Sequence, residues 1–185
     1  LPRPGSGSGV REGSGRAGNL RPHRRGALLD LTGEVRAADG PVWDGVSTYL
    51  APGATVEGTP EATASAAYEP APPIATWRLP AGLGRDYRRV SGDPNPIHTW
   101  VLAARAFGFA RPIIHGMWTH ARLPEAYAVD VSFVRPILLP ATVGAWWRPE
   151  GDAWTAAVTT ADGAKPHLLA RVSDLPERAD RSQAP

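Results

Sequence analysis

The feature that most constrains the fold is a strand–turn–strand pattern that occurs twice in the chain. In the first copy, apolar and polar side chains alternate over residues 27–36, which is the period of a strand with one buried face. Asp39-Gly40 follows, a dipeptide that tolerates the positive φ angles of a tight hairpin turn, and residues 42–50 form the returning strand. The second copy has the same parts: residues 154–160, Asp162-Gly163 and residues 167–172. Two such hairpins predict antiparallel β-structure.

The two hairpins also resemble each other in sequence. Residues 35–40 (VRAADG) match residues 158–163 (VTTADG), and each string is followed by a strand that reaches a Val-Ser pair. This similarity is typical of a repeated structural unit, although two unrelated hairpins can match this well by chance. The second hairpin ends a full unit that begins near Ile74, whereas the first has no such unit before it. We therefore expect the end of one repeat and nearly all of a second. Leu1 in place of an initiating Met predicts a chain that is processed, a fragment or wrongly started.

The domain organisation follows from the distribution of Gly and Pro. These residues number 20 each and are concentrated before residue 25 and between residues 51 and 82, which indicates segments without a core of their own. Five segments are expected: a disordered basic tail (1–22), the terminal hairpin of a truncated first repeat (23–50), a linker (51–73), the main domain (74–175) and a second tail (176–185).

Within the main domain, short apolar runs bounded by turn residues predict further strands and short helices. Strands are expected over residues 74–79, 127–133 and 142–147, and helices over residues 82–90 and 117–122. Pro124 ends the second helix, because proline restricts the residue before it and has no N–H to donate. At about 1.5 Å per residue, this helix is only about 10 Å long.

Charge and composition argue against several functions. Six arginines crowd the first 25 residues, but no aromatic side chains are interleaved with them, so we interpret them as a solvated tail and expect no nucleic-acid partner. No apolar run approaches the length of a membrane span. The chain has no cysteine, which excludes disulfides and thiolate metal sites and fits a reducing compartment such as the cytoplasm.

One segment, residues 87–116, combines reactive side chains, rigid backbone and glycines at short spacing. Asp93 and His98 lie five residues apart, and Pro94 and Pro96 stiffen the backbone between them. Two interpretations fit this pattern. In the first, Asp93 caps the start of a helix and His98 is a buried, hydrogen-bonded side chain. In the second, the two residues are an acid–base pair in an active-site loop.

The whole segment resembles the signature of the MaoC-like dehydratases, also called hydratase 2 or (R)-specific enoyl hydratases. That signature has an aromatic residue, the string Ser/Thr-Gly-Asp-x-Asn-Pro-Ile/Leu-His, a helix, Gly-Phe or a similar pair, and the string Pro-Ile-x-His-Gly. The residues that carry the resemblance here are Tyr87, residues 91–98, Gly108-Phe109 and residues 112–117. The resemblance covers residues 74–173 well, and residues 20–50 more weakly as the end of the first half of two-repeat members.

The resemblance implies an α+β hotdog fold, in which an antiparallel sheet wraps around a central helix, here shortened, after a remnant of a preceding hotdog repeat. It also implies a hydro-lyase of fatty acid metabolism, which reversibly adds water to a 2-enoyl thioester of coenzyme A or acyl carrier protein to give a 3-hydroxyacyl thioester. Asp93 and His98 would hold the water and move protons, and the N–H of Gly116 would stabilise the thioester oxygen. Supporting or substrate-binding roles fall to four further residues: Ser91, Asn95, Tyr87 and His115. No metal and no cofactor are expected, since coenzyme A or acyl carrier protein enters only as the carrier of the substrate.

Two other functions stay open at this point. The truncated first repeat favours a catalytically inactive hotdog remnant that acts as a binding or oligomerisation module. A hotdog thioesterase is disfavoured, because the Asp-x-Asn-Pro-x-His string belongs to the hydratases. With or without catalysis, a sheet edge left exposed by the missing repeat predicts a homodimer or pairing with another hotdog subunit.

Overall fold

The structure is a computed structural model that describes residues 12–38, 40–60, 68–123 and 128–173. The chain divides into two compact units, Leu1–Ser65 and Ala66–Pro185. Asp39 of the first predicted turn and the predicted tail over residues 176–185 lie outside the described residues. No helix in the described ranges is both long enough and apolar enough to cross a membrane.

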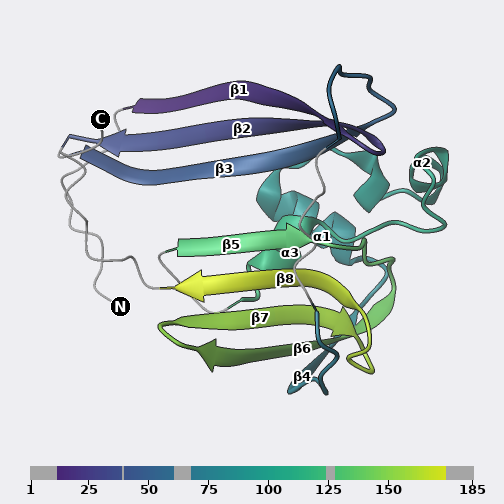
Figure 1. Ribbon diagram of the computed structural model, residues 1–185. Helices are drawn as coiled ribbons and strands as arrows, with labels where there is room; N and C mark the ends of the chain where they lie inside the picture. The colour runs from purple at the N-terminus through teal and green to yellow at the C-terminus, as the bar shows by residue number, and fades with distance from the viewer. Residues whose placement is uncertain (1–11, 39, 61–67, 124–127, 174–185) are drawn as a thin grey trace. The chain divides into compact units, whose positions relative to one another are not determined.

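The first unit is a three-stranded antiparallel sheet whose strands follow one another in sequence order (Figure 1). Its strands are β1 (Glu12–His23), β2 (Gly26–Ala37) and β3 (Gly40–Pro52). Strands β2 and β3 form the predicted first hairpin, in register from the pair Gly26 and Pro52 to the pair Ala37 and Gly40. The alternating pattern therefore predicted this hairpin correctly.

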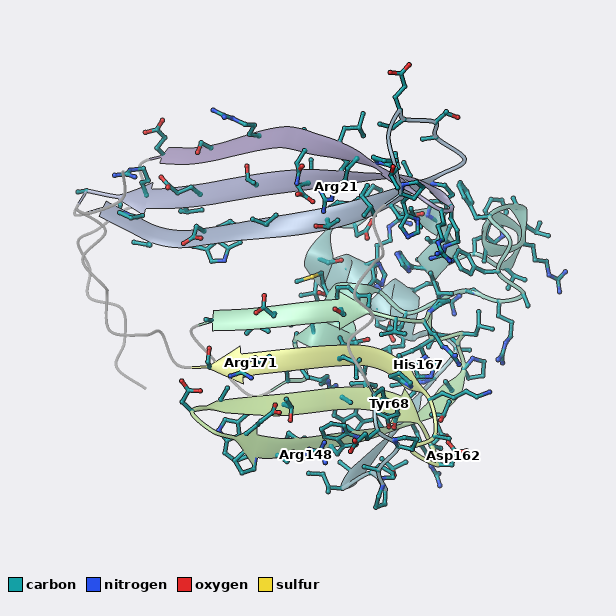
Figure 2. All side chains as sticks on the ribbon, in the orientation of Figure 1. Arg21, Tyr68, Arg148, Asp162, His167 and Arg171 are labelled. Carbon is teal, nitrogen blue, oxygen red and sulfur yellow. The ribbon has the colours of Figure 1, made fainter. Side chains whose placement is uncertain are left out.

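Strand β1 corrects the expectation that residues 1–22 are disordered, because Glu12–His23 is a β-strand. It pairs with β2 from Glu12 and Arg36 to His23 and Gly26, so main-chain hydrogen bonds hold it although its Gly-rich sequence offers few apolar side chains. A polar cluster adds to this pairing: Asp30 on β2 accepts hydrogen bonds from Arg21 (2.9 Å), Thr48 (2.7 Å) and Asn19 (2.6 Å). These three donors lower the pKa of Asp30 to about 2. Arg21 is labelled in Figure 2.

The second unit contains a five-stranded antiparallel sheet in the order β4-β6-β7-β8-β5 (Figure 1). Its elements in chain order are β4 (Ala75–Leu79), α1 (Leu83–Ser91), the 3₁₀ helix η1 (Pro96–His98), α2 (Val101–Ala106), α3 (Gly116–His120), β5 (Ala128–Phe133), β6 (Ala141–Glu150), β7 (Ala153–Thr160) and β8 (Pro166–Ser173). The strands and helices predicted for the main domain are all found within a few residues of their expected bounds. Strands β6, β7 and β8 pair in sequence order, as β1, β2 and β3 do in the first unit.

The apolar core lies on one face of the five-stranded sheet, and α3 supplies little of it. Ten buried side chains form the cluster: Leu79, Ile114, Ile137, Leu139, Val143, Ala156, Val158, Leu168, Ala170 and Val172. Helix α3 has five residues, so the prediction of a shortened central helix is confirmed. Trp118 on α3 packs against this cluster and meets the Trp77 ring edge-on, with the ring centroids 6.4 Å apart.

The short helix leaves part of the core-facing side of the sheet uncovered by the described residues. Opposed residues in an antiparallel pair share a face, so Val129 and Trp154, both opposite Val172, lie on the same face as the core. Yet Val129 is 37% exposed and Trp154 45%. Phe133, opposite the buried Leu168, is 55% exposed. A longer central helix would bury such side chains.

The end of the predicted linker packs against the other face of this sheet. Tyr68, labelled in Figure 2, stacks on Trp146 of β6 with 6.3 Å between ring centroids, and its hydroxyl donates to the carbonyl of Gly163. Pro73 lies over Gly144, where a Cβ would come within 2.6 Å of the proline ring. The expectation that the whole of residues 51–73 has nothing to bury is therefore wrong for its last residues, because Gly144 leaves space for them.

Candidate active site

A short loop between α1 and η1 fixes the carboxylate of Asp93 by local hydrogen bonds. Its Oδ1 atom accepts a 2.9 Å hydrogen bond from the N–H of Asn95, while the Asp93 N–H donates to Ser91 Oγ at 3.3 Å. Asn95 Oδ1 in turn accepts from the N–H of Ile97 and caps η1. The loop thus occupies one oxygen of Asp93 and leaves Oδ2 for other partners, and it gives Ser91 and Asn95 an orienting role.

His98 is held in one tautomer by the main chain. Its side chain is buried, and Nδ1 lies 2.9 Å from the carbonyl oxygen of Ile113. Because a carbonyl oxygen can only accept, Nδ1 carries the hydrogen, and in a neutral imidazole Nε2 is then a bare acceptor. This Nε2 lies 3.8 Å from Asp93 Oδ2, slightly beyond a direct hydrogen bond. A small polar molecule that reaches both atoms would find two acceptors side by side.

His115 completes the cluster from a position 17 residues further along the chain. Its ring stacks on His98 with centroids 3.7 Å apart and planes inclined by 25°, and the ring of Tyr87 meets it at 4.9 Å. Its Nε2 lies 3.7 Å from Asp93 Oδ2. The side chain is 3% exposed, and neither ring nitrogen has a hydrogen-bond partner in the described part of the chain. The structure therefore brings Tyr87, Asp93, His98 and His115 together at one place.

Burial lowers the pKa of His115, and the neighbouring His98 lowers it further, while Asp93 acts in the opposite direction. The free energy of unfolding should therefore fall as the pH drops below the ordinary histidine value of about 6.5, because the unfolded chain then binds a proton that the folded chain does not. One such group contributes a slope of up to about 1.4 kcal/mol per pH unit. Burial also lowers the pKa of His167, which adds a contribution of the same sign.

We expect His115→Phe, which keeps a stacked ring without a titrating nitrogen, to weaken this pH dependence between pH 7 and 5. The measurement is urea unfolding of both proteins at several pH values. Parallel curves for wild type and variant would show that His115 binds its proton equally well in both states.

Gly116 is the first residue of α3, and its N–H has no assigned acceptor among the described residues. A Cβ at this position would lie 2.8 Å from the ring of Phe133 on β5. Glycine at this position therefore leaves space for the aromatic ring of Phe133. The alternation along β5 put Phe133 on a strand face but gave no sign of its contact with Gly116.

Gly84 is a second residue whose place at the site the sequence did not reveal. It lies buried in α1, and a Cβ there would be 1.9 Å from the carbonyl oxygen of His98. Since no real Cβ contact is that short, α1 and the His98 main chain can approach this closely only with glycine at position 84. A glycine inside a helix lowers the stability of the helix by about 1 kcal/mol relative to alanine. A glycine at a position predicted to be helical was therefore the one sign in the sequence that position 84 has a special packing role.

One group of His and carboxylate side chains in the described residues is close enough to share a metal ion: Asp93, His98 and His115. Their possible ligand atoms all lie within 4.8 Å of one another. The spacing of the histidines in the sequence gave no sign of this. Metal–nitrogen bonds of about 2.0–2.1 Å run in the plane of the imidazole ring. Two rings stacked 3.7 Å apart direct their lone pairs side by side rather than at a common point, so this arrangement does not fit a metal ion bound by both histidines.

In this antiparallel sheet, all the helices of the described residues lie in the chain between edge strand β4 and the next strand, β5. This arrangement is that of a hotdog protein. Residues 83–161 match the MaoC like domain. The chain is 38% identical over 169 residues to 3-hydroxyacyl-thioester dehydratase X of Mycobacterium tuberculosis, and the match covers 86% of this chain and 60% of that protein. The chain belongs to the family of MaoC-like dehydratases, and it spans about 60% of the length of this curated relative.

Two solved structures are also similar to this chain. The crystal structure of HtdX from Mycobacterium tuberculosis superposes with a TM-score of 0.71 at 37% identity, covering 88% of this chain and 68% of that one. A MaoC-like dehydratase from Phytophthora capsici superposes with a TM-score of 0.71 at 16% identity, covering 89% of this chain and 65% of that one. The second likeness concerns the fold alone.

Proposed function

We propose that the chain catalyses the reversible addition of water to a 2-enoyl thioester, giving a 3-hydroxyacyl thioester. The observation that carries this proposal is the pairing of Asp93 Oδ2 with the bare Nε2 of His98 across 3.8 Å. Similarity to a protein described as a 3-hydroxyacyl-thioester dehydratase supports the choice of reaction. The substrate carrier is coenzyme A or acyl carrier protein, and the reaction belongs to fatty acid metabolism in the cytoplasm.

In the proposed step, one water lies between Asp93 Oδ2 and His98 Nε2. Its oxygen bonds to C3 of the substrate as one of its protons passes to Nε2, and the electron pair of the double bond moves toward the thioester carbonyl. The proton on the dyad then passes to C2, so that water has been added and both side chains return to their starting forms. Positioned acid–base groups of this kind typically contribute about 10²–10⁴-fold each.

The thioester oxygen gains negative charge while the C3–O bond forms. The N–H of Gly116, which has no acceptor assigned among the described residues, is the donor that we propose for it. The ring of Phe133 lies beside Gly116 and covers the side on which a Cβ would stand. His115 acts as a neutral, buried support for the His98 ring.

The test is an assay of the purified chain with a short 2-enoyl-CoA. Hydration is expected to remove the ultraviolet absorbance of the conjugated thioester and to produce the 3-hydroxyacyl thioester, identified by mass spectrometry. Release of free thiol in place of this product would indicate a thioesterase. A folded chain that leaves the substrate unchanged would contradict the proposal.

We also propose that no metal ion takes part. Overnight dialysis against EDTA is therefore expected to leave kcat within about twofold of its starting value. Added Zn²⁺ or Mg²⁺ should give no increase. A loss of activity on dialysis that one of these ions restores would assign Asp93, His98 and His115 to a metal centre instead.

A second candidate function is a binding or oligomerisation module without turnover. The exposure of Phe133, Val129 and Trp154 on the core-facing side favours it, since a partner could cover them. Edge strand β5 could also pair with a second copy or with another hotdog subunit. A stable dimer or mixed complex that shows no hydration of any enoyl thioester would select this function over catalysis.

A further inference from the structure

Helix α1 carries three exposed arginines on the side away from the histidine cluster. Arg85, Arg88 and Arg89 are spaced i, i+3 and i+4 and therefore share one face of the helix. Tyr87, about half a turn away, is directed instead toward His115. The three arginines border a hollow of about 590 Å³ whose other walls are Pro96, Thr99 and Trp100.

The positive charge of this hollow is only partly balanced. Arg89 forms an ion pair with Asp86 at 2.6 Å, on the exposed surface of the same helix. For Arg85 and Arg88, the described residues provide no carboxylate within ion-pair distance. Two guanidinium groups are thus available to an anion. Planar guanidinium groups bind phosphate and carboxylate oxygens through two parallel hydrogen bonds, so both side chains are suited to hold a phosphate group.

An aromatic surface lies beside these charges. Trp100 is 62% exposed although it lies in a well-defined turn between η1 and α2, where its N–H donates to the Pro96 carbonyl at 2.9 Å. This main-chain hydrogen bond fixes the backbone at Trp100, and the exposed indole ring offers a flat face on which a nucleobase can stack. The volume of the hollow falls within the usual 300–1,000 Å³ of small-molecule sites.

The hollow adjoins the proposed reaction centre. Pro96 and Thr99 flank His98 in the chain, and α1 presents its arginines to the hollow and Tyr87 to the histidine cluster. A molecule bound there therefore lies against the same loop and helix that hold Asp93 and His98. A second hollow of about 450 Å³, at Arg78 and Pro140, shares none of these residues.

We propose that the hollow binds the phosphorylated adenosine of coenzyme A, with Arg85 and Arg88 on the phosphates and Trp100 against the adenine. This inference rests on the proposed function, because it names the carrier on which the enoyl group arrives. It selects coenzyme A over acyl carrier protein, since a protein carrier presents a phosphodiester but no adenine for Trp100.

The experiment compares two substrates with the same enoyl group, one on coenzyme A and one on pantetheine, which has no phosphate and no adenosine. The double variant Arg85→Gln/Arg88→Gln is expected to raise KM for the coenzyme A thioester by about tenfold or more and to leave kcat unchanged. Its KM for the pantetheine thioester should stay at the wild-type value. Arg78→Gln, which removes one charge at the other hollow, is the control and should affect neither substrate.

Binding of adenosine 3′,5′-bisphosphate, measured by calorimetry, separates this inference from the proposed function. Arg-dependent binding of this probe, lost also in Trp100→Ala, is expected even if the chain hydrates nothing. If the chain is active and the double substitution raises KM equally for both thioesters, or for neither, the inference is overturned. The same holds if the probe does not bind and only an enoyl thioester of acyl carrier protein becomes a poorer substrate in the double variant.

Discussion

Asp93→Asn is expected to lower kcat for hydration of a 2-enoyl-CoA by about a thousandfold. The amide keeps the Oδ1 acceptor for the N–H of Asn95, so the loop retains its shape. What it removes is the charged oxygen that faces the rings of His98 and His115 at 3.8 and 3.7 Å. Without that oxygen, a water beside His98 Nε2 loses one of its two acceptors and the protonated imidazole loses its counter-charge.

The measurement is the initial rate of absorbance loss at saturating substrate, with the free energy of unfolding from urea as a check on folding. Asp152→Asn is the matched control, because Asp152 is an exposed acid whose ion-pair partner in the described part of the chain is Arg171, at 3.5 Å. Its rate should equal that of wild type. His98→Ala should lose as much activity as Asp93→Asn. If Asp93→Asn kept the wild-type kcat, the acid–base assignment would be wrong, whatever the chain then proved to do.

Local patterns in the sequence were enough to predict most of the second unit. The strand–turn–strand pattern of residues 154–160, Asp162-Gly163 and residues 167–172 predicted β7 and β8 to within a few residues. The loop from Ser91 to His98 was also predictable, because its hydrogen bonds join residues two apart and its prolines restrict the backbone. In both cases the determining interactions lie within a few residues of one another.

Features that depend on distant residues were not predictable in this way. Strand β1 is held by main-chain pairing with β2 and by hydrogen bonds from Arg21 and Asn19 to Asp30. These interactions need no alternating apolar side chains, so the Gly-rich sequence gave no sign of a strand. The same holds within the site. His115 was expected to have a supporting or substrate-binding role, but the sequence did not predict that it stacks on a histidine 17 residues earlier. The hydrogen bond between His98 and the carbonyl of Ile113, 15 residues away, helps to hold the two rings together.

Gly84 belongs to this second group, and Gly84→Ala is the other substitution with a large expected effect. In a helix, alanine is favoured over glycine by about 1 kcal/mol, so a helix-propensity argument alone predicts a more stable protein. The added Cβ, however, would lie 1.9 Å from the His98 carbonyl oxygen and 3.0 Å from its carbon, both main-chain atoms that no side-chain rotation can move away. Helix α1 and η1 must separate by more than 1 Å to restore an ordinary contact of about 3.5 Å.

That separation carries His98 away from Asp93 and Ile113, so we expect kcat to fall about a hundredfold, the typical cost of a 1 Å misplacement at a reacting group. The free energy of unfolding should fall by about 1–3 kcal/mol, the usual cost of overpacking. Gly82→Ala is the control: it lies two residues away at the start of the same helix, and its Cβ would meet nothing closer than Arg85 Nη2 at 3.7 Å. It should keep full activity and stability. Equal behaviour of the two alanine variants would show that close packing of α1 on His98 does not position the catalytic imidazole.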